Sequence, residues 1–504
     1  MLSGGNKMDN LMYLKSGTDI RGTAFSKDGG AVDLTDERLE SITSAFVDFL
    51  VGKLGKSEFK IAVGYDSRVS SKRIFDSVTK TLLSRGVKVF DSGLSSTPSM
   101  FMSIINFDFD ASVEITASHL PMEMNGLKFF TREGGFSGAD IEKILKTAEE
   151  KPYKAADSGL VPEKCDNMNV YCANLCKMIC AGVNAADYDK PLAGMKIVVD
   201  AGNGVGAFYA DKVLKVLGAD TEGSRYLEPD GTFPNHIPNP ENKDAMRSIC
   251  DAVIEAKADF GVIFDTDCDR AACVDKTGAE INRNRLVALA SYIALKSCPG
   301  GVIVTDSVTS AGLAKFIEKH LGGVHHRFKR GYKNVIDEAV RLKNEEGKAA
   351  PLAIETSGHA AFSENYYLDD GAYLITKIII EAALLAKEGK TIEKILEPLE
   401  MPAEEKEQRY KIHLDDFKPY GNAVIADLKA LCESTDGITV EPVNYEGVRV
   451  NFDENGGNGW LLLRMSVHEP LLVLNVESAS VGGNEKMLAF FADFIAKYDK
   501  VTLK

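Results

Sequence analysis

The sequence lacks an apolar run long enough to cross a membrane. Its most apolar long segment, residues 373–386, is interrupted by Lys377 and Glu381, which is typical of an amphipathic helix in a globular protein. An apolar leader is also missing, because residues 1–7 (MLSGGNK) are mostly polar. We therefore expect neither membrane attachment nor export.

An excess of positive charge is missing as well, since 59 Lys and Arg residues face 74 Asp and Glu residues and the net charge is −15. This balance argues against a broad nucleic-acid surface, although it still allows a locally basic cleft. The nine cysteines lack a regular framework spacing, which favours a reducing cytoplasm. Cys172, Cys176 and Cys180 recur every four residues and could bind metal, but this spacing also places them on one apolar helix face. We favour the helix.

What the sequence does contain is enough material for several cores. A chain of 504 residues exceeds what one hydrophobic core normally serves, and its 44% hydrophobic and 26% charged residues are ordinary for a globular protein. Three runs rich in β-branched residues are each followed by a helical stretch, a glycine-led junction and a polar loop. The runs begin at Lys60 (KIAVGYDS), Lys196 (KIVVDAGN) and Gly301 (GVIVTDSV), and the loops contain Ser118, Asp265 and Glu355. This weak repeat predicts three copies of one α/β domain with polar groups beyond the strand ends.

The last hundred residues or so follow a different pattern. The charged run 404–407 (EEKE) predicts a linker, and the runs 459–464 and 471–477 predict two strands whose hairpin carries Arg464, Ser466, His468 and Glu469. The fold class is therefore α/β, with three similar α/β domains with mixed sheets followed by a smaller α+β C-terminal domain. We place the domains at residues 1–155, 156–287, 288–400 and 401–504.

Three carboxylates stand at alternate positions in residues 265–270 (DTDCDR), directly after the apolar run 260–264. Asp265, Asp267 and Asp269 would repel one another unless a cation joins them, and an all-oxygen ligand set suits Mg²⁺. A calcium-binding EF-hand is excluded, because that loop requires Gly where Arg270 stands and Glu where Lys276 stands.

A serine and a histidine stand side by side in residues 115–121 (ITASHLP). Alone, such a pair is typical of a turn. Together with residues 265–270, 355–359 (ETSGH) and 464–470 (RMSVHEP), however, this loop resembles the active-site loops of the α-D-phosphohexomutases, the family that includes phosphoglucomutase and phosphomannomutase. Residues 15–22 (KSGTDIRG) resemble the opening signature of that family, S-G-I-R-G, with Asp19 inserted.

The resemblance implies roles for the reaction centre. Ser118 would carry a phosphoryl group and would share a metal ion with Asp265, Asp267 and Asp269. Four cations match family positions that line the centre, where they would neutralise the transferred group: Arg21, His119, Lys128 and Arg270. His359 and Lys128 are the candidates for general acid and base, and the sequence leaves their order open.

The resemblance also implies a substrate site. Glu355 and Ser357 would bind the hexose hydroxyls, and Lys333, in the basic run 327–334 (RFKRGYKN), matches another cleft position. Arg464 and Ser466 would hold the phosphate that does not react. Two positions depart from the family pattern: Thr266 replaces a glycine in the metal loop, and His468 replaces a threonine in the phosphate loop.

The resulting prediction is a cytoplasmic isomerase of the phosphoglucomutase/phosphomannomutase type. It would interconvert hexose 1- and 6-phosphates, of glucose and/or mannose, through a phosphoserine enzyme and a hexose 1,6-bisphosphate that also serves as activator, with Mg²⁺ as cofactor. Its partner would be a small-molecule sugar phosphate, with no nucleic acid and no membrane, and the protein would be a monomer or weak homo-oligomer. The alternatives are a metal-dependent sugar phosphatase, a phosphoglucosamine mutase, or a non-catalytic binding protein.

Overall fold

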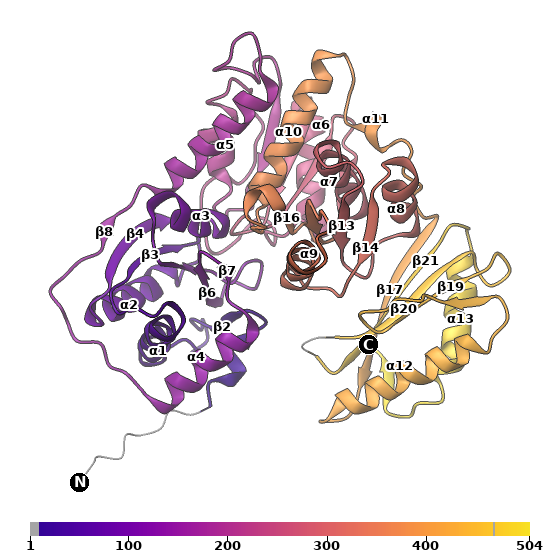
Figure 1. Ribbon diagram of the computed structural model, residues 1–504, viewed down its shortest axis with the longest axis horizontal. Helices are drawn as coiled ribbons and strands as arrows, with labels where there is room; N and C mark the ends of the chain where they lie inside the picture. The colour runs from indigo at the N-terminus through magenta and orange to yellow at the C-terminus, as the bar shows by residue number, and fades with distance from the viewer. Residues whose placement is uncertain (1–9, 467–468) are drawn as a thin grey trace. The chain divides into compact units, whose positions relative to one another are not determined.

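The computed structural model describes residues 10–466 and 469–504. The chain forms two compact units, the first made of Met1–Asn282 and Ser357–Glu393 and the second of Arg283–Thr356 and Lys394–Lys504 (Figure 1).

The first sheet of unit 1 is mixed, with strand order β1-β2-β6-β5-β3-β4-β8 and with β7 paired to β6. Strands β3, β4, β5 and β8 are parallel, whereas β6 and β2 run antiparallel to their neighbours. The strands are β1 (Lys15–Ser16), β2 (Asp19–Thr23), β3 (Lys60–Tyr65), β4 (Lys88–Leu94), β5 (Ala111–Ile115), β6 (Met124–Thr131), β7 (Gly134–Gly135) and β8 (Glu163–Lys164).

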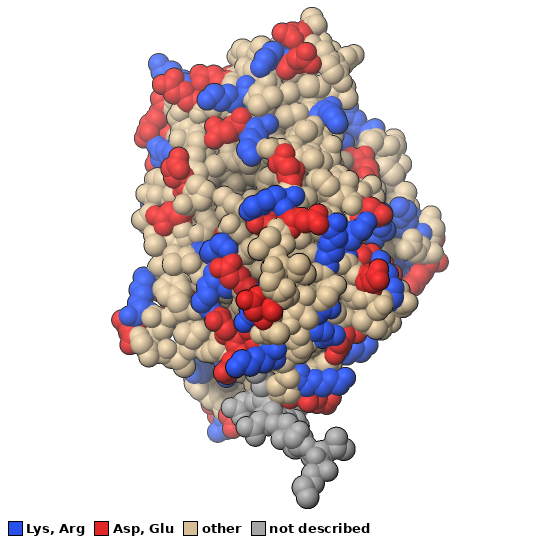
Figure 2. Space-filling view, turned by 90° about the vertical axis from the view of Figure 1, so that its left-hand side faces the viewer, with Lys and Arg blue, Asp and Glu red and all other residues tan. Residues whose placement is uncertain are grey.

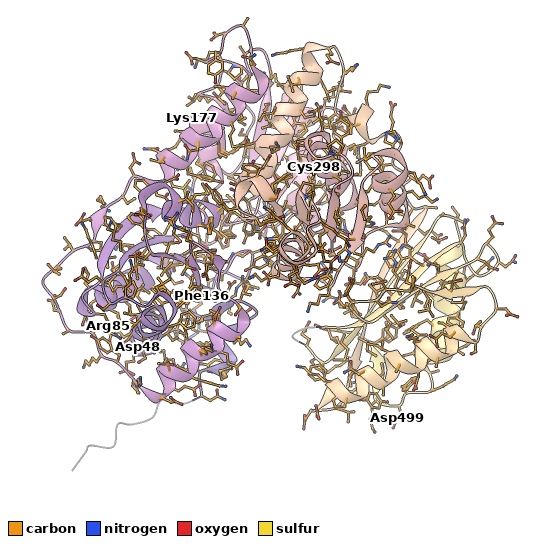
Figure 3. The ribbon with its side chains drawn as sticks, viewed as in Figure 1. Asp48, Arg85, Phe136, Lys177, Cys298 and Asp499 are labelled. Atoms are coloured by element: carbon orange, nitrogen blue, oxygen red, sulfur yellow. The ribbon has the colours of Figure 1, made fainter. Side chains whose placement is uncertain are left out.

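Helices cover both faces of this sheet, because successive strand residues point to opposite sides. Ile61 and Val63 share a core with η1 (Met12–Leu14), α1 (Asp36–Leu54), α2 (Ser71–Ser84) and α4 (Gly138–Glu150), whereas Ala62 belongs to a separate core with α3 (Thr97–Phe107). Arg85, at the end of α2, donates to Asp48 of α1 at 2.6 Å and so ties these two helices together (Figure 3).

The second sheet of unit 1 has the order β12-β11-β10-β9, with β9 (Ile197–Asp200) parallel to β10 (Phe260–Phe264). Antiparallel β11 (Ala271–Asp275) and β12 (Glu280–Ile281) complete it. One face shares a core with α6 (Lys243–Ala256). The remaining elements of the unit are α5 (Asn167–Val183), the π-helix η2 (Tyr209–Leu214), β16 (Ala360–Phe362), η4 (Ser363–Asn365) and α10 (Gly371–Lys387), and α5 packs against both η2 and α10.

Unit 2 begins with the parallel strands β14-β13-β15. They are β13 (Val302–Thr305), β14 (Val324–Arg327) and β15 (Leu352–Ile354), with helices α7 (Arg283–Ser297), α8 (Ala311–Lys315), the π-helix η3 (Phe316–His320) and α9 (Tyr332–Glu346). The short helix α11 (Glu393–Leu396) leads into the C-terminal part of the chain.

The C-terminal part is an antiparallel sheet in the order β18-β19-β20-β21-β17-β22. Its strands are β17 (Glu404–Ile412), β18 (Ile438–Val440), β19 (Val448–Phe452), β20 (Gly459–Met465), β21 (Leu471–Ser478) and β22 (Val501–Leu503). Helices α12 (Phe417–Glu433) and α13 (Gly483–Ile495) share one core with it. The predicted hairpin is β20-β21, and the predicted fold class is confirmed.

The predicted linker at 404–407 is wrong, because these residues begin strand β17 and pair with β21 from Glu404↔Ser478 onward. Their side chains are largely exposed in the strand. Charged residues are therefore tolerated at these positions, as they are in a linker, and composition alone does not distinguish the two. The carboxylate of Glu404 also accepts hydrogen bonds from the backbone N–H groups of Gly482 and Asn484 (2.8 and 3.0 Å), at the start of α13. An anionic group at a helix N-terminus is favourable there.

Three further features relate to expectations from the sequence: the apolar helices, the cysteines of α5 and the distribution of surface charge. Within the described residues, no helix has the length and apolar character to span a bilayer, and residues 373–386 lie in α10. Cys172, Cys176 and Cys180 lie on α5, where Cys172 and Cys180 are buried and all three are free thiols. Acidic and basic side chains are interspersed on the face shown in Figure 2.

Candidate active site

Ser118 lies in the loop that follows β5, at the carboxyl end of a strand in the middle of the first sheet. Its side chain is buried and its φ is +52°, in the left-handed region that non-glycine residues rarely adopt. The Ser118 N–H donates to Oγ1 of Thr116 at 2.8 Å. A buried non-glycine residue held in this conformation is a feature typical of functional loops.

The hydroxyl of Ser118 connects two distant loops of unit 1. Its Oγ donates to Oδ2 of Asp265 at 2.9 Å and accepts a hydrogen bond from the guanidinium of Arg270 at 2.8 Å. Nδ1 of His119 lies 3.3 Å from the same Oγ and also contacts Arg270. Burial, together with the charges of Arg270 and Arg21, lowers the pKa of His119 to about 2, so its ring is neutral.

Asp265, Asp267 and Asp269 are all buried, and one carboxylate oxygen of each lies within 4.8 Å of the others. Burial and the charges of Asp269 and Asp267 raise the pKa of Asp265 well above its ordinary value. Oδ1 of Asp267 and Oδ1 of Asp269 are buried and have no hydrogen-bond partner among the described residues. Buried carboxylate oxygens without donors fit a cation that binds oxygen ligands.

The metal loop needs no glycine at Thr266. Its left-handed residue is Cys268, with φ +61°, and Thr266 is fully buried with an ordinary negative φ. The turn that brings the aspartates together is therefore made at Cys268, two positions after the residue that is a glycine in the family pattern. The departure at Thr266 does not disturb the cluster.

Lys128 of β6 lies inside this acidic cluster. Its buried ammonium donates to Oδ2 of Asp267 at 3.0 Å and to Oδ2 of Asp269 at 2.5 Å. Burial opposes the ionisation of Asp269, but the charges of Lys128, His359 and Arg270 outweigh it and hold the pKa of Asp269 below its ordinary value. Part of the negative charge of the cluster is thus balanced by the protein itself.

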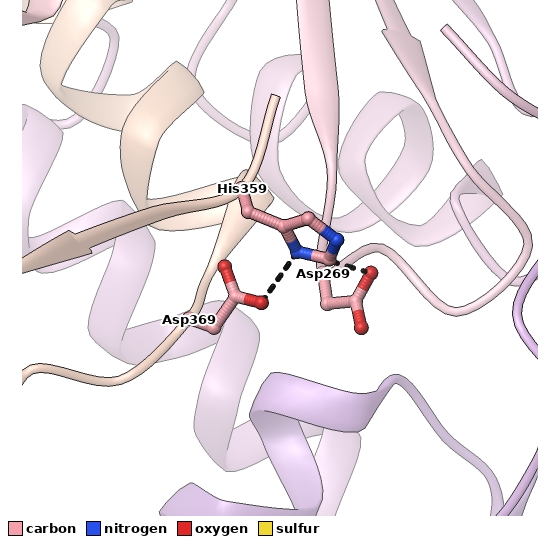
Figure 4. A group of neighbouring side chains, drawn as sticks. All are labelled: Asp269, His359 and Asp369. Carbon is pink, nitrogen blue, oxygen red and sulfur yellow. Dashed lines mark hydrogen bonds and ion pairs between the residues drawn. The ribbon is translucent and has the colours of Figure 1, made fainter. Parts of the chain in front are cut away.

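His359 lies between two carboxylates (Figure 4). Its Nδ1 is 2.5 Å from Oδ2 of Asp369 and 3.9 Å from Oδ1 of Asp269. Burial lowers the pKa of His359, but the charges of Asp369 and Asp269 outweigh this effect and raise it to about 9. The two carboxylates therefore favour the protonated form of the ring.

Asp369 was missed by the sequence reasoning. It stands beside Asp370, whose side chain accepts a hydrogen bond from the N–H of Tyr373 at the start of α10. An acidic pair before a helix is typical of an N-cap, so the pair gave no separate signal for a partner of His359.

Arg21 also belongs to this part of unit 1. Its guanidinium donates to Oδ2 of Asp19 at 2.7 Å and to the carbonyl oxygen of Ala117, next to Ser118, at 3.4 Å. The inserted residue Asp19 thus orients the arginine. The structure places Arg21, Ser118, His119, Lys128, Asp265, Asp267, Asp269, Arg270 and His359 within one network of contacts.

In unit 2, Glu355 follows β15 and is buried, and its Oε1 accepts a hydrogen bond from the N–H of Gly331 at 2.6 Å. Lys333, on α9, forms an ion pair with Asp337 one turn further along the same helix. Ser357, the third predicted substrate residue of this region, is buried and belongs to unit 1.

Arg464 lies near the end of β20, in unit 2. Its side chain is 8% exposed, Nη1 is 3.7 Å from Oε1 of Glu446, and Nε is buried without a hydrogen-bond partner in the described chain. Burial, only partly opposed by the charge of Glu446, lowers the pKa of Arg464. A desolvated guanidinium with an unused N–H is suited to an anion.

Only part of the predicted phosphate-binding loop around Arg464 is described. Ser466 accepts a hydrogen bond from the N–H of Glu469 through its Oγ, at 3.3 Å. His468 lies outside the described residues. Glu446 was not predicted from the sequence, and its carboxylate also accepts hydrogen bonds from Oγ of Ser307 and the N–H of Arg330, at 2.7 and 3.0 Å.

The chain is similar to known proteins over most of its length. The family models described as phosphoglucomutase/phosphomannomutase, alpha/beta/alpha domains I, II and III match residues 14–154, 171–278 and 282–401. A phosphoglucomutase of Neisseria meningitidis serogroup A is 30% identical over 434 residues, which cover 86% of this chain and 87% of the relative. A phosphomannomutase/phosphoglucomutase of Pseudomonas putida is 28% identical over 445 residues, 88% of this chain and 89% of the relative.

A solved structure shows the same fold. The crystal structure of a phosphoglucomutase/phosphomannomutase family protein from Burkholderia thailandensis aligns with a TM-score of 0.80 at 26% identity, and the alignment covers 98% of this chain and 100% of that one.

Proposed function

Because this chain belongs to the phosphoglucomutase/phosphomannomutase family, we propose that it interconverts hexose 1-phosphates and hexose 6-phosphates through a phosphorylated Ser118. The observation that carries the proposal is the environment of Oγ of Ser118, which contacts both a carboxylate of the acidic cluster and the guanidinium of Arg270. A phosphoryl group on this oxygen would meet both a cation-binding cluster and a fixed positive charge.

The reaction consists of two transfers. In the first, a hexose phosphate hydroxyl attacks the phosphorus of phosphorylated Ser118, the bond from phosphorus to Oγ breaks, and a hexose 1,6-bisphosphate forms. In the second, Oγ of Ser118 attacks the other phosphoryl group of the bisphosphate, which restores the phosphoserine and releases the isomer. Arg270, buried beside Oγ, would stabilise the negative charge on the transferring group in both directions.

Asp265, Asp267 and Asp269, with the oxygen at Ser118, are the residues that would hold Mg²⁺. When bound, the ion supplies positive charge that neutralises the phosphoryl oxygens. The fit rests on the three buried carboxylates and on the two oxygens that lack donors.

His359 and Lys128 remain the candidates for proton transfer. Asp369, which lies outside the predicted metal cluster, is 2.5 Å from Nδ1 of His359 and favours its protonated form, so we assign His359 as the general acid. Lys128 pairs with Asp267 and Asp269. We assign it as the general base, because its ammonium lies within the same acidic cluster beside Ser118.

The second phosphate of the substrate needs its own site, because the bisphosphate must present either end to Ser118. We propose Arg464 and Ser466 for this site, supported by the buried and only partly neutralised guanidinium of Arg464.

The test is incubation of the protein with glucose 1-phosphate, Mg²⁺ and a trace of glucose 1,6-bisphosphate. Formation of glucose 6-phosphate without free phosphate supports the mutase. Release of inorganic phosphate would identify a phosphatase instead, and an unchanged substrate would indicate a binding protein.

A further inference from the structure

We propose that Arg68 is a positioning residue that fixes the conformation of the Ser118 loop, and this inference rests on the proposed function. Arg68 lies in the segment between β3 and α2. Its guanidinium donates hydrogen bonds to the carbonyl oxygens of Leu120 at 2.6 Å, Pro121 at 2.8 Å and Met124 at 2.9 Å, and it also contacts the carbonyl oxygen of Ser118. One side chain thus holds four carbonyls of one loop.

The guanidinium is itself held in place. The side chains of Arg68 and Asp66 are fully buried, and Nε of Arg68 lies 3.2 Å from Oδ2 of Asp66. Oδ1 of Asp66 accepts hydrogen bonds from the N–H of Arg68 at 3.0 Å and from Oγ of Ser71 at 2.9 Å. A planar guanidinium fixed in this way presents its donors in one geometry, whereas an ammonium would not.

Packing from a third segment closes the site around Arg68. A side chain at Gly231 would place its Cβ only 2.4 Å from the backbone nitrogen of Val69, so this glycine allows the close approach of its segment to residues 67–69. The ring of Phe233 lies 5.2 Å from the Arg68 guanidinium carbon. Arg68 is therefore enclosed by the Ser118 loop, its own segment and the 231–233 segment.

The consequence concerns Ser118, whose left-handed φ is unfavourable for a non-glycine residue. With its carbonyl bound to Arg68 and its N–H bound to Thr116, the peptide groups on both sides of Ser118 are fixed. The only remaining freedom is the side-chain torsion that carries Oγ. Arg68 thus acts on phosphoryl transfer through the loop, without touching the substrate.

The experiment compares wild type, Arg68→Lys, Arg68→Ala and a control, Arg73→Ala, in the full-length protein with glucose 1-phosphate, Mg²⁺ and glucose 1,6-bisphosphate. Arg73 is a matched control because it also donates to loop carbonyls, those of Ala24 and Leu34, away from Ser118. A misplaced reacting atom lowers the rate of transfer by about 100-fold, so we expect kcat of Arg68→Lys to fall by about that factor with KM within about threefold. Arg73→Ala should keep the wild-type kcat.

Chemical rescue provides the second readout. Guanidinium ion at millimolar concentration should restore part of the activity of Arg68→Ala, whereas ammonium at the same ionic strength should not. The inference is overturned if Arg68→Lys keeps kcat within about threefold of wild type, or if kcat, KM and Mg²⁺ affinity worsen together as in a general loss of structure.

The inference and the proposed function can fail separately. If the wild type does not isomerise the substrate, the proposed function fails. Amide hydrogen exchange of residues 117–124 then tests separately whether Arg68 fixes the conformation of the Ser118 loop. Faster exchange in Arg68→Lys than in wild type supports the positioning role, and unchanged exchange overturns it.

Discussion

Oγ of Ser118 donates a hydrogen bond of 2.9 Å to Oδ2 of Asp265, although the two residues are 147 positions apart in the chain. The serine follows a strand of the first sheet, and the aspartate follows a strand of the second, both in unit 1. The proposed phosphoryl carrier and the acidic cluster are therefore brought together by the packing of two α/β sheets within one compact unit. Changes at either residue should affect the same chemical step.

The first prediction concerns Ser118→Ala. Turnover should be abolished, because no other hydroxyl of the described chain makes both contacts of Ser118, to Asp265 and to Arg270. Intact mass measured after treatment with glucose 1,6-bisphosphate should show one added phosphoryl group in the wild type and none in the variant. A phosphoryl group found by peptide mapping on another residue would remove Ser118 from its assigned role.

The second prediction concerns Asp267→Asn. Loss of one carboxylate from the cluster should weaken Mg²⁺ binding in a calorimetric titration and lower kcat, while the fold is retained. Repulsion among the aspartates is also relieved, so the metal-free variant should be at least as stable as the wild type. Asp220→Asn is the control, because Asp220 is partly exposed and pairs with Lys196. Full activity of Asp267→Asn in excess chelator would contradict a catalytic metal.

The third prediction concerns Arg464→Ala. Removing one partner of a desolvated, charge-assisted pair weakens binding by roughly 2–5 kcal/mol, so we expect a large loss of substrate affinity and impairment of both transfers. Arg409→Ala is the control, since Arg409 is exposed and pairs with Glu407 on the same strand, β17. An affinity change below about threefold for Arg464→Ala, which is under 1 kcal/mol, would show that the phosphate binds elsewhere.

The fourth prediction concerns pH and His236, which is not one of the proposed site residues. Nε2 of His236 is 3.0 Å from Oδ1 of Asp200, and its Nδ1 is 3.0 Å from the carbonyl oxygen of Ile237. Burial opposes protonation, but the hydrogen bond and charge of Asp200 outweigh it and raise the pKa of His236. The protonated ring therefore stabilises the folded state. This stabilisation is fully present below the pKa of His236 in the unfolded chain, about 6.5, and is lost as pH rises through its higher pKa in the folded protein.

Hydrogen exchange of residues 225–240 is the appropriate measurement, because it reports on this segment alone. Protection in the wild type should exceed that in His236→Gln at pH 6, and the difference should shrink by pH 9. An equal difference at both pH values would mean that the Asp200 contact does not depend on the charge of His236.

Much of the fold followed from sequence because its signals are local. The β-branched runs at Lys60, Lys196 and Gly301 are the starts of β3, β9 and β13, and the segment 373–386 lies within helix α10. The prediction of a linker at 404–407 is wrong because this part of β17 is exposed on both faces, so its charged residues show no alternation that would indicate a strand.

The partners of the site residues could not be predicted, because tertiary neighbours define them. Asp369 resembles a helix cap in sequence, yet its carboxylate binds His359. Arg68 and Glu446 stand in ordinary polar turns. Only the packing of other segments brings the carbonyls of the Ser118 loop to Arg68 and the guanidinium of Arg464 to Glu446. The chemical roles of the site residues, and the three boundaries between the four predicted domains, remain predictions.

The last prediction concerns the choice of sugar, which follows from the requirement that the substrate bind in two opposite orientations. Only hydroxyls near the axis of that reversal are useful to both orientations, and the family resemblance assigns the 3- and 4-hydroxyls to Glu355 and Ser357. Both side chains are buried, and Glu355 already accepts a hydrogen bond from Gly331. Its carboxylate is therefore oriented before the sugar arrives, which favours one hydroxyl geometry.

Glucose and mannose are alike at these positions and differ at carbon 2, to which no residue of the site is assigned. The kcat/KM values of glucose 1-phosphate and mannose 1-phosphate should therefore agree within about two orders of magnitude. Galactose has an inverted 4-hydroxyl, which would leave a buried polar group unpaired, so the kcat/KM of galactose 1-phosphate should be lower by roughly 10⁴-fold. The measurement is kcat/KM for the 1-phosphates of glucose, mannose, glucosamine and galactose on one preparation. Efficient use of galactose would remove Glu355 and Ser357 from the sugar site, and strong exclusion of either glucose or mannose would reveal a contact at carbon 2.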